Sequence, residues 1–184
     1  MHSVKGVKQF VCAMILVGFV ALGQQSGYAK GNVETSGDVL AVLLPTIAYG
    51  STFYMDDEEG RIAFYKSFFS TLAVTQGLKY SVKKTRPDGS DNRSFPSGHS
   101  SASFQAASFI QMRYGWEYGV PAYLTASYVA WSRVHAKKHY VADVVAGASI
   151  GILGSYLFTE PYKGLTITPV ASSQQFGVLV SARW

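Results

Sequence analysis

Three short clusters of polar residues carry the side chains that could perform chemistry. His139 and Asp143, in the last cluster, are four residues apart, and side chains with that spacing meet on one face of a helix. A carboxylate placed there can accept the Nδ1 proton of the imidazole, which leaves Nε2 as an electron-rich nucleophile. The spacing therefore predicts an activated histidine. For an isolated pair, a weak surface ion pair is the more common outcome.

The second cluster is the tetrapeptide Pro96-Ser97-Gly98-His99, which stands directly before an apolar segment. A helix that begins here presents unpaired amides and the positive end of its dipole, and both attract anions. Gly98 allows the backbone to approach an anion closely, and Ser97 adds a hydroxyl donor. His99 is then placed to protonate a leaving oxygen. The alternative is an ordinary helix start with Ser97 as its N-cap.

Three cations complete the set: Lys79, Arg86 and Arg133. The two guanidinium groups match pairs of phosphate oxygens, and the lysine supplies a point charge. A phosphoryl group in transfer spreads charge over three equatorial oxygens, so its stabilisation is mainly electrostatic. Three cations and helix amides can supply this without a metal. Taken singly, each of them would usually be a solvated surface charge.

Together, the clusters resemble the signature motifs of the type 2 phosphatidic acid phosphatase superfamily. That superfamily includes lipid phosphate phosphatases, bacterial class A acid phosphatases and vanadium haloperoxidases. The resemblance covers roughly residues 38 to 158, and every signature position is present in order. The matching motifs are Lys79-x6-Arg86-Pro87, Pro96-Ser97-Gly98-His99 and Ser132-Arg133-x5-His139-x3-Asp143.

The resemblance implies a role for each matching position. It implies His139 as the nucleophile, Asp143 as its partner and His99 as the general acid of a metal-independent, phosphohistidine mechanism. It implies no metal and no cofactor, and it makes vanadate an inhibitory mimic of phosphate. The implied phosphate ligands are Lys79, Arg86, Ser97, Gly98 and Arg133.

Helices have to position these residues, and the hydrophobic pattern predicts five of them. A polar loop at 83–98 separates the second from the third. The resemblance also implies an all-α bundle, so we expect five to six helices with the catalytic motifs at one end. Residues 164–184 alternate with period two and predict a short C-terminal β-hairpin, a strand pair that caps the helices. The five apolar segments are Asp38 to Met55, Ile62 to Leu78, His99 to Tyr114, Val120 to Trp131, and Val141 to Phe158.

The N-terminus has the pattern of a secretory signal. Lys5 and Lys8 precede an apolar stretch at 9–23, and small residues follow before position 30. We expect residues 1–29 to be a signal peptide, with a retained membrane helix as the alternative. The phosphatase domain is then 30–184, with a linker at 30–37. The single cysteine, Cys12, lies in the signal, so no disulfide framework is expected.

Composition leaves soluble and membrane forms in contention. Charged residues make up 15% and apolar residues 48%, whereas about a quarter is charged in an average soluble domain. The segments have 12 to 18 residues, short of the ~20 of a spanning helix. The acidic turn at 56–59 would be cytoplasmic in a six-span topology, against the positive-inside rule. We therefore expect a periplasmic protein, soluble or on the outer side of the inner membrane. The alternative is an integral six-helix protein.

The sequence thus predicts a metal-independent phosphatase that hydrolyses phosphomonoesters, with lipid phosphates as the expected substrates. The alternatives are a broad-specificity soluble acid phosphatase, a vanadate-dependent haloperoxidase, or a module that binds phosphate or lipid without turnover. Expected partners are a phosphorylated lipid or small phosphomonoester and a membrane surface. Basic residues form no long run, so no nucleic acid partner is expected.

Overall fold

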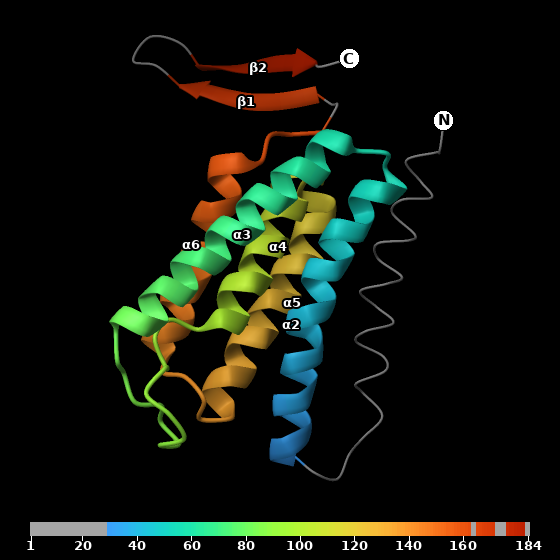
Figure 1. The fold of residues 1–184 in the computed structure, drawn as a ribbon. Helices are drawn as coiled ribbons and strands as arrows, with labels where there is room; N and C mark the ends of the chain where they lie inside the picture. Colours follow the sequence, from blue (N-terminus) through green and yellow to red (C-terminus); the bar gives the residue numbers. More distant parts are fainter. Residues whose placement is uncertain (1–28, 163–164, 172–175, 183–184) are drawn as a thin grey trace.

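In the part of the chain that the structure describes, five helices run up and down in one bundle (Figure 1). The computed structural model describes residues 29–162, 165–171 and 176–182. The expected all-α architecture is confirmed for its helical body, and the signal-peptide prediction lies outside the described residues. The helices are α2 (Ala29–Tyr54), α3 (Glu58–Ser81), α4 (Gly98–Tyr114), α5 (Trp116–His135) and α6 (Val141–Phe158).

Helix α2 begins nine residues earlier than the apolar pattern predicts, so the linker expected at 30–37 is wrong. Residues 30–37 are mostly polar, but they pack against α5. The Ser36 hydroxyl lies 2.8 Å from that of Tyr128. At Gly37 a Cβ atom would lie 1.9 Å from Ser132 Oγ. Contacts between helices therefore extend α2 through residues whose local propensity is for a loop.

Four of these five helices are longer than the apolar segments that predict them, and α6 has the same length as its segment. The five helices have 26, 24, 17, 20 and 18 residues in chain order. Three of them thus reach or exceed the ~20 residues of a membrane-spanning helix, so the length argument against spanning is wrong for α2, α3 and α5. By length and hydropathy, α6 is the one described helix that could cross a membrane.

Helix α4 lies at the centre and contacts each of the other four. Leu44, Phe64, Phe109 and Ile110 are among the large side chains of the buried core. The approach of α6 depends on small residues, because a Cβ at Gly151 would lie 2.3 Å from the backbone oxygen of Ser101. Small residues at such positions let helix backbones come close.

One end of the bundle is held by a buried ion pair. Asp57 caps α3, and its carboxylate accepts hydrogen bonds from Arg113 Nε (2.7 Å) and Nη2 (2.5 Å). Both side chains are almost fully buried. Arg113 Nη1 also donates to the carbonyl of Glu160, 2.8 Å away, beyond the end of α6. We call this the far end, and the end at which α4 and α6 begin the motif end.

After α6, β1 (Leu165–Ala171) and β2 (Phe176–Ala182) pair antiparallel, with Leu165 opposite Ala182. The strand pair expected at 164–184 as a cap on the helices stays a prediction, because the side chains of these strands lie outside the described part of the chain.

Candidate active site

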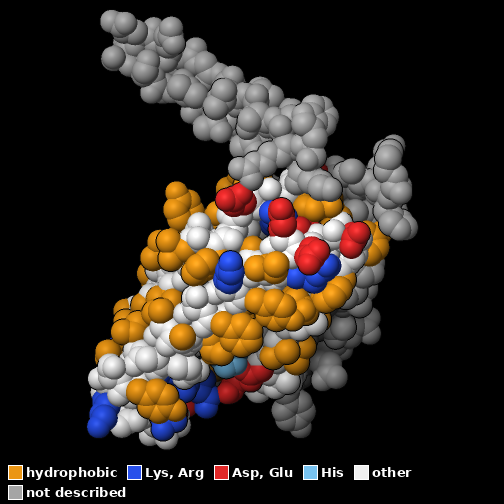
Figure 2. Space-filling view, turned by 45° about the horizontal axis from the view of Figure 1, so that its top comes forward, with side chains coloured by type: hydrophobic (Ala, Val, Ile, Leu, Met, Phe, Trp, Pro, Cys, Tyr) orange, Lys and Arg blue, Asp and Glu red, His pale blue; other side chains and the backbone are white. Residues whose placement is uncertain are grey.

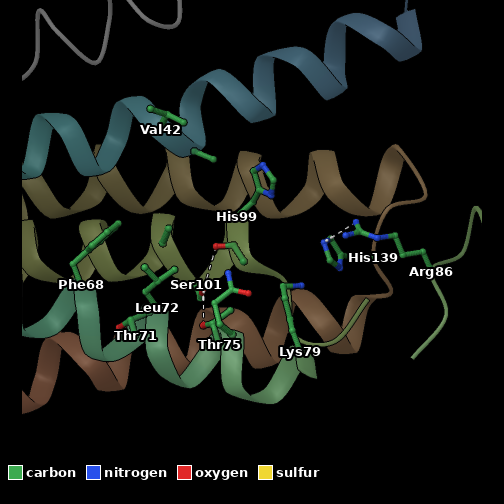
Figure 3. A pocket seen from close by; sticks show the side chains of 14 residues that line it. Val42, Phe68, Thr71, Leu72, Thr75, Lys79, Arg86, His99, Ser101 and His139 are labelled. Carbon is green, nitrogen blue, oxygen red and sulfur yellow. Dashed lines mark hydrogen bonds between the residues drawn. The ribbon is translucent and has the colours of Figure 1, made fainter. Parts of the chain in front are cut away.

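The three sequence clusters converge at the motif end, where a pocket of about 340 Å³ opens (Figure 3). Lys79 comes from the last turn of α3, and His99 comes from the first turn of α4. Arg86 and His139 lie on the two loops beside them. Four of the predicted residues thus line one pocket through their side chains, and Gly98 lines it as well.

His139 is held by its backbone and by one ring nitrogen. Its amide donates to the carbonyl of Arg133, at the end of α5 (3.3 Å). Nδ1 lies 2.6 Å from the carbonyl oxygen of Ser94, and Nε2 lies 3.5 Å from Arg86 Nη1. A carbonyl can only accept, so the proton is assigned to Nδ1. The lone pair of Nε2 then faces Arg86.

The surroundings of His139 keep its ring neutral. Burial, and then the positive charges of Lys79 and Arg86, lower its pKa from 6.5 to about 4. An imidazole acts as a nucleophile only when it is unprotonated. The ring is therefore in the reactive form at neutral pH.

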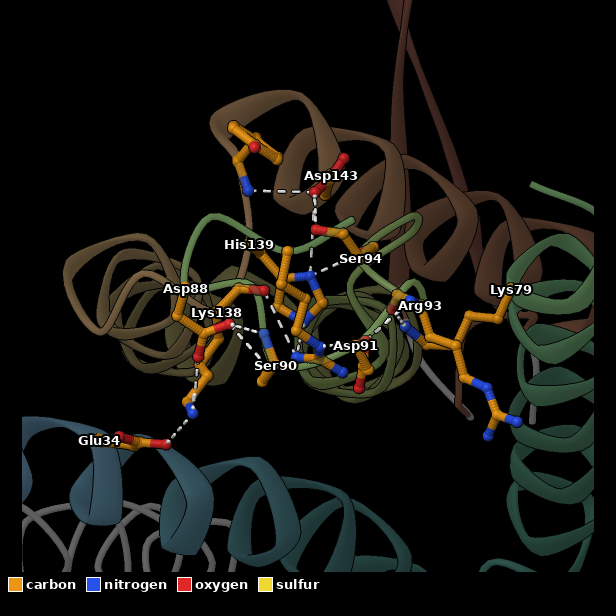
Figure 4. Close-up of polar contacts among 12 residues, drawn as sticks. Glu34, Lys79, Asp88, Ser90, Asp91, Arg93, Ser94, Lys138, His139 and Asp143 are labelled. Carbon is orange, nitrogen blue, oxygen red and sulfur yellow. Dashed lines mark hydrogen bonds and ion pairs between the residues drawn. The ribbon is translucent and has the colours of Figure 1, made fainter. Parts of the chain in front are cut away.

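Asp143 does not bond directly to His139, which corrects the expected pairing. Its Oδ2 is 4.0 Å from Nδ1 and instead accepts from Ser94 Oγ (2.5 Å) and the amide of Tyr140 (3.0 Å). Its Oδ1 pairs with Lys84 (2.6 Å). Asp143 is three residues past the N-cap of α6, so its carboxylate folds back over the helix start. Ser94 thus links the two residues, since its Oγ donates to Asp143 and its carbonyl accepts from His139 (Figure 4).

The two pocket cations are held by contacts with the loop between α3 and α4 and with the loop between α5 and α6. Arg86 Nε donates to Asp91 Oδ1 (2.7 Å), and its Nη1 lies 3.4 Å from the carbonyl of Lys138. Lys79 Nζ donates to the carbonyl of Arg93 (2.9 Å). These bonds hold both cations before any ligand arrives, which favours anion binding.

Ser97 and Gly98 occupy the start of α4 as the tetrapeptide predicts. Ser97 is fully buried and is the N-cap, since its Oγ accepts from the amide of Ser100 at 3.3 Å. It does not line the pocket, so the N-cap interpretation holds and its role as a phosphate ligand stays a prediction. A Cβ at Gly98 would meet Lys79 Cε at 3.7 Å, an ordinary contact. Space within the protein therefore does not require glycine there.

Arg133 is buried and points to α2, not into the pocket. Its Nη1 donates to Asp38 Oδ1 and its Nη2 to the carbonyl of Glu34, both at 2.5 Å. Its role as a phosphate ligand stays a prediction. Sequence reasoning missed Asp38 and Ser94, which contact the motif residues from distant segments, as Lys84 also does. In the described part of the chain, no group of His, Cys, Asp or Glu could hold a metal ion.

A sequence profile of the PAP2 superfamily matches residues 61–164 of this chain. The chain belongs to the PAP2 superfamily. The lipid A 4'-phosphatase of Helicobacter pylori is 31% identical over 170 residues, which are 83% of this chain and 85% of that protein. The lipid A 1-phosphatase of Porphyromonas gingivalis is 40% identical over 79 residues, 41% of this chain but 18% of that protein. This PAP2 protein is accordingly a phosphoester hydrolase.

Two solved structures share the fold of this PAP2 chain. LpxE of Aquifex aeolicus matches with a TM-score of 0.54 and 21% identity, over 85% of this chain and 86% of its own. A transmembrane PAP2-type phosphatidylglycerolphosphate phosphatase from Bacillus subtilis matches with a TM-score of 0.55 and 24% identity, over 80% and 83%.

Proposed function

We propose that this protein is a membrane-embedded lipid phosphatase that works through a phosphohistidine at His139. One observation carries the proposal: the same pocket has a cationic end with a histidine and an apolar end. His139, Lys79 and Arg86 lie at one end, and apolar side chains of α2 and α3 line the other. These apolar residues are Ala41, Val42, Phe68 and Leu72. Such a pocket suits a phosphate attached to an apolar body.

The reaction takes two displacements. Nε2 of His139 attacks phosphorus opposite the leaving oxygen, and the phosphorus–oxygen bond breaks while His99 gives that oxygen a proton. Water then attacks the phosphohistidine, His99 takes the proton of the water, and the nitrogen–phosphorus bond breaks. Lys79 and Arg86 balance the charge on the equatorial oxygens during both steps. Vanadate should imitate phosphate in this pocket and inhibit.

Both relatives are lipid A phosphatases, so we take a phosphorylated glycolipid of the lipid A class as the candidate substrate. Thr75 and Gln76 line the pocket beside its apolar side chains. Polar side chains in that position suit the sugar hydroxyls of a glycolipid better than a plain acyl chain.

The distribution of side chains supports the integral membrane alternative over a soluble domain. Large apolar side chains point outward, among them Val42, Leu124 and Leu157, each more than half exposed. The buried face of α4 is instead rich in serine and alanine. In Figure 2, hydrophobic side chains cover the middle of the visible face and charged ones gather toward its two ends. This inverts the arrangement of a soluble protein and suits lipid surroundings.

The test is phosphate release in EDTA by wild type, His139→Ala and His135→Ala. His135 stacks on Trp131 (centroids 4.9 Å apart) and does not line the pocket, so it is a matched control. Substrates are an aryl phosphate, lipid A, phosphatidic acid and phosphatidylglycerolphosphate. We expect His139→Ala to lose at least about a thousandfold in kcat and His135→Ala to keep wild-type activity. Phosphate release that survives in His139→Ala would contradict the mechanism. Halide oxidation with vanadate and peroxide, without phosphate release, would indicate a haloperoxidase.

We place the motif end on the outer side of the inner membrane. Lys5 and Lys8 precede the apolar stretch at 9–23 and should keep that end in the cytoplasm, so α2 begins outside. In a Cys12→Ser background, Ser90→Cys at the motif end should react with an impermeant maleimide in cells with a permeabilised outer membrane. Glu58→Cys at the far end should react only after lysis. The opposite labelling pattern would place the motif end in the cytoplasm. The positive-inside rule favours that topology, because many basic residues lie near the pocket.

A further inference from the structure

One carboxylate oxygen of α2 lies between two of the predicted catalytic groups. Asp38 Oδ1 is 2.5 Å from Arg133 Nη1 and 2.9 Å from His99 Nε2. The Asp38 side chain is 47% exposed, whereas that of Arg133 is 3% exposed. The contact therefore sits at the boundary between the buried guanidinium and the open pocket.

The packing of α2 on α5 builds this contact. A Cβ at Gly37 would lie 1.9 Å from Ser132 Oγ and 2.7 Å from Arg133 Nη2, so only glycine permits the approach seen here. One turn earlier on α2, the carbonyl of Glu34 accepts from Arg133 Nη2. Arg133 thus makes two bonds to α2, and the one to the Glu34 carbonyl holds the guanidinium in place for its contact with Asp38.

We propose that Asp38 is a positioning residue that holds His99 as the proton donor for the leaving oxygen. The proposal rests on the phosphatase function proposed above. With its carboxylate against Nε2, Asp38 stabilises the imidazolium and orients the ring. Nδ1 then carries the transferred proton: its N–H bond breaks and an O–H bond forms as the phosphorus–oxygen bond breaks. In the second step, a proton of the attacking water returns to Nδ1.

The charges around His99 make this carboxylate necessary. Burial of the ring disfavours a protonated imidazole most. The charged groups that act on it electrostatically are Arg133 from α5, Asp38 from α2, Lys79 from α3 and Arg86 from the loop. Three of these are cations, which disfavour the protonated ring further. Asp38 supplies the negative charge that opposes them.

The experiment compares kcat and KM of wild type, Asp38→Asn and Asp88→Asn on an alkyl lipid phosphate and an aryl phosphate. An alkoxide is a poor leaving group and needs the proton, whereas an aryl oxide leaves largely without it. Asp88 pairs with Lys138 at the same end of the bundle (3.0 Å), so Asp88→Asn is the matched control. Asp38→Asn should lose about 10- to 100-fold in kcat on the lipid phosphate and less than about 3-fold on the aryl phosphate. Asp88→Asn should change neither.

An equal loss on both substrates, or no loss, would overturn the positioning role. Tighter inhibition of Asp38→Asn by inorganic phosphate, with no leaving-group effect, would instead mark Asp38 as a competitor of the substrate phosphate. If Asp38→Asn does not fold, Asp38→Glu decides, since it keeps the charge, shifts it by one methylene, and should give a smaller difference of the same sign. Wild type that releases phosphate from neither substrate would overturn the proposed function itself.

Discussion

The carbonyl oxygen of Ser94 lies 2.6 Å from Nδ1 of His139, while the carboxylate of Asp143 stands 4.0 Å away. The loop before α4 therefore sets the tautomer of the proposed nucleophile, and Asp143 acts by holding that loop. A backbone acceptor cannot be removed by substitution. The contribution of the loop has to be measured through the side chains that hold it.

Ser94→Ala should lower kcat by about 3- to 10-fold, the equivalent of one hydrogen bond of roughly 1 kcal/mol. The substitution keeps the carbonyl and removes the bond from Ser94 Oγ to Asp143. Asp143→Asn should cost more activity because it also breaks the pair with Lys84. The double variant should be no slower than Asp143→Asn, since both act through one contact. Steady-state phosphate release measures all three, and additive losses would assign Asp143 a separate role.

The acid limit of the reaction should reflect the pKa of His139. That pKa is lowered from 6.5 to about 4, by burial first and then by Lys79 and Arg86. Protonation removes the nucleophile, so kcat/KM of the free enzyme should persist as pH falls and be lost only near pH 4. Lys79→Gln removes a nearby positive charge and should move this limb to higher pH.

The readout is the difference between the pH profiles of the two enzymes on one aryl phosphate, because the ionisation of the substrate is then common to both. A limb that stays in place in Lys79→Gln would show that the lysine does not act on His139 through its charge.

Two glycine-to-alanine substitutions, one at the contact of α6 with α4 and one on an open face of α2, should have opposite effects on stability. Gly151→Ala places a Cβ 2.3 Å from the backbone oxygen of Ser101, so it should destabilise the protein by about 1–3 kcal/mol. At Gly50, within α2, a Cβ would meet no atom within 4 Å. Gly50→Ala should therefore stabilise by about 0.5–1 kcal/mol through helix propensity. Thermal unfolding in detergent gives both shifts in Tm, and shifts of the same sign would contradict the packing described.

Loss of the far-end ion pair should reduce stability without slowing catalysis. Arg113→Met leaves the charge of Asp57 buried without its main partner, which should cost about 3–5 kcal/mol. Lys66→Gln removes an exposed cation of α3 and should change stability by less than about 0.5 kcal/mol. The fraction of Arg113→Met that remains folded should have wild-type kcat, because the pair lies at the end opposite the pocket. A reduced kcat per folded molecule would couple the two ends.

The sequence predicted the bounds of a helix correctly where the apolar residues of that segment extend over the whole helix. Helix α6 has the bounds expected from its apolar run, Val141 to Phe158. The start of α2 was missed because residues 30–37 are polar, and only their contact with α5 makes them helical. Apolar length likewise understated α3 and α5, whose ends carry polar residues at the motif end and at the far end.

The candidate site shows the same division. The motifs correctly predicted that His99 and His139 lie in one pocket. It could not register Asp38, which is 95 positions from Arg133, or Ser94, which is 49 positions from Asp143. Only the fold creates such pairs. The prediction of a direct bond from Asp143 to His139 was wrong because the i, i+4 rule applies inside a helix, and His139 precedes α6.

The Asp57–Arg113 pair joins the start of α3 to the last turn of α4 at the far end of the bundle. With 24 residues, α3 is about 36 Å long, so a tilt of about 5° about this contact would displace Lys79, in its last turn, by roughly 3 Å. The bond from Lys79 to the carbonyl of Arg93 opposes such a tilt at the motif end. Helix α3 is thus anchored at both of its ends, which keeps this lysine in register with the histidines of α4 and of the loop before α6.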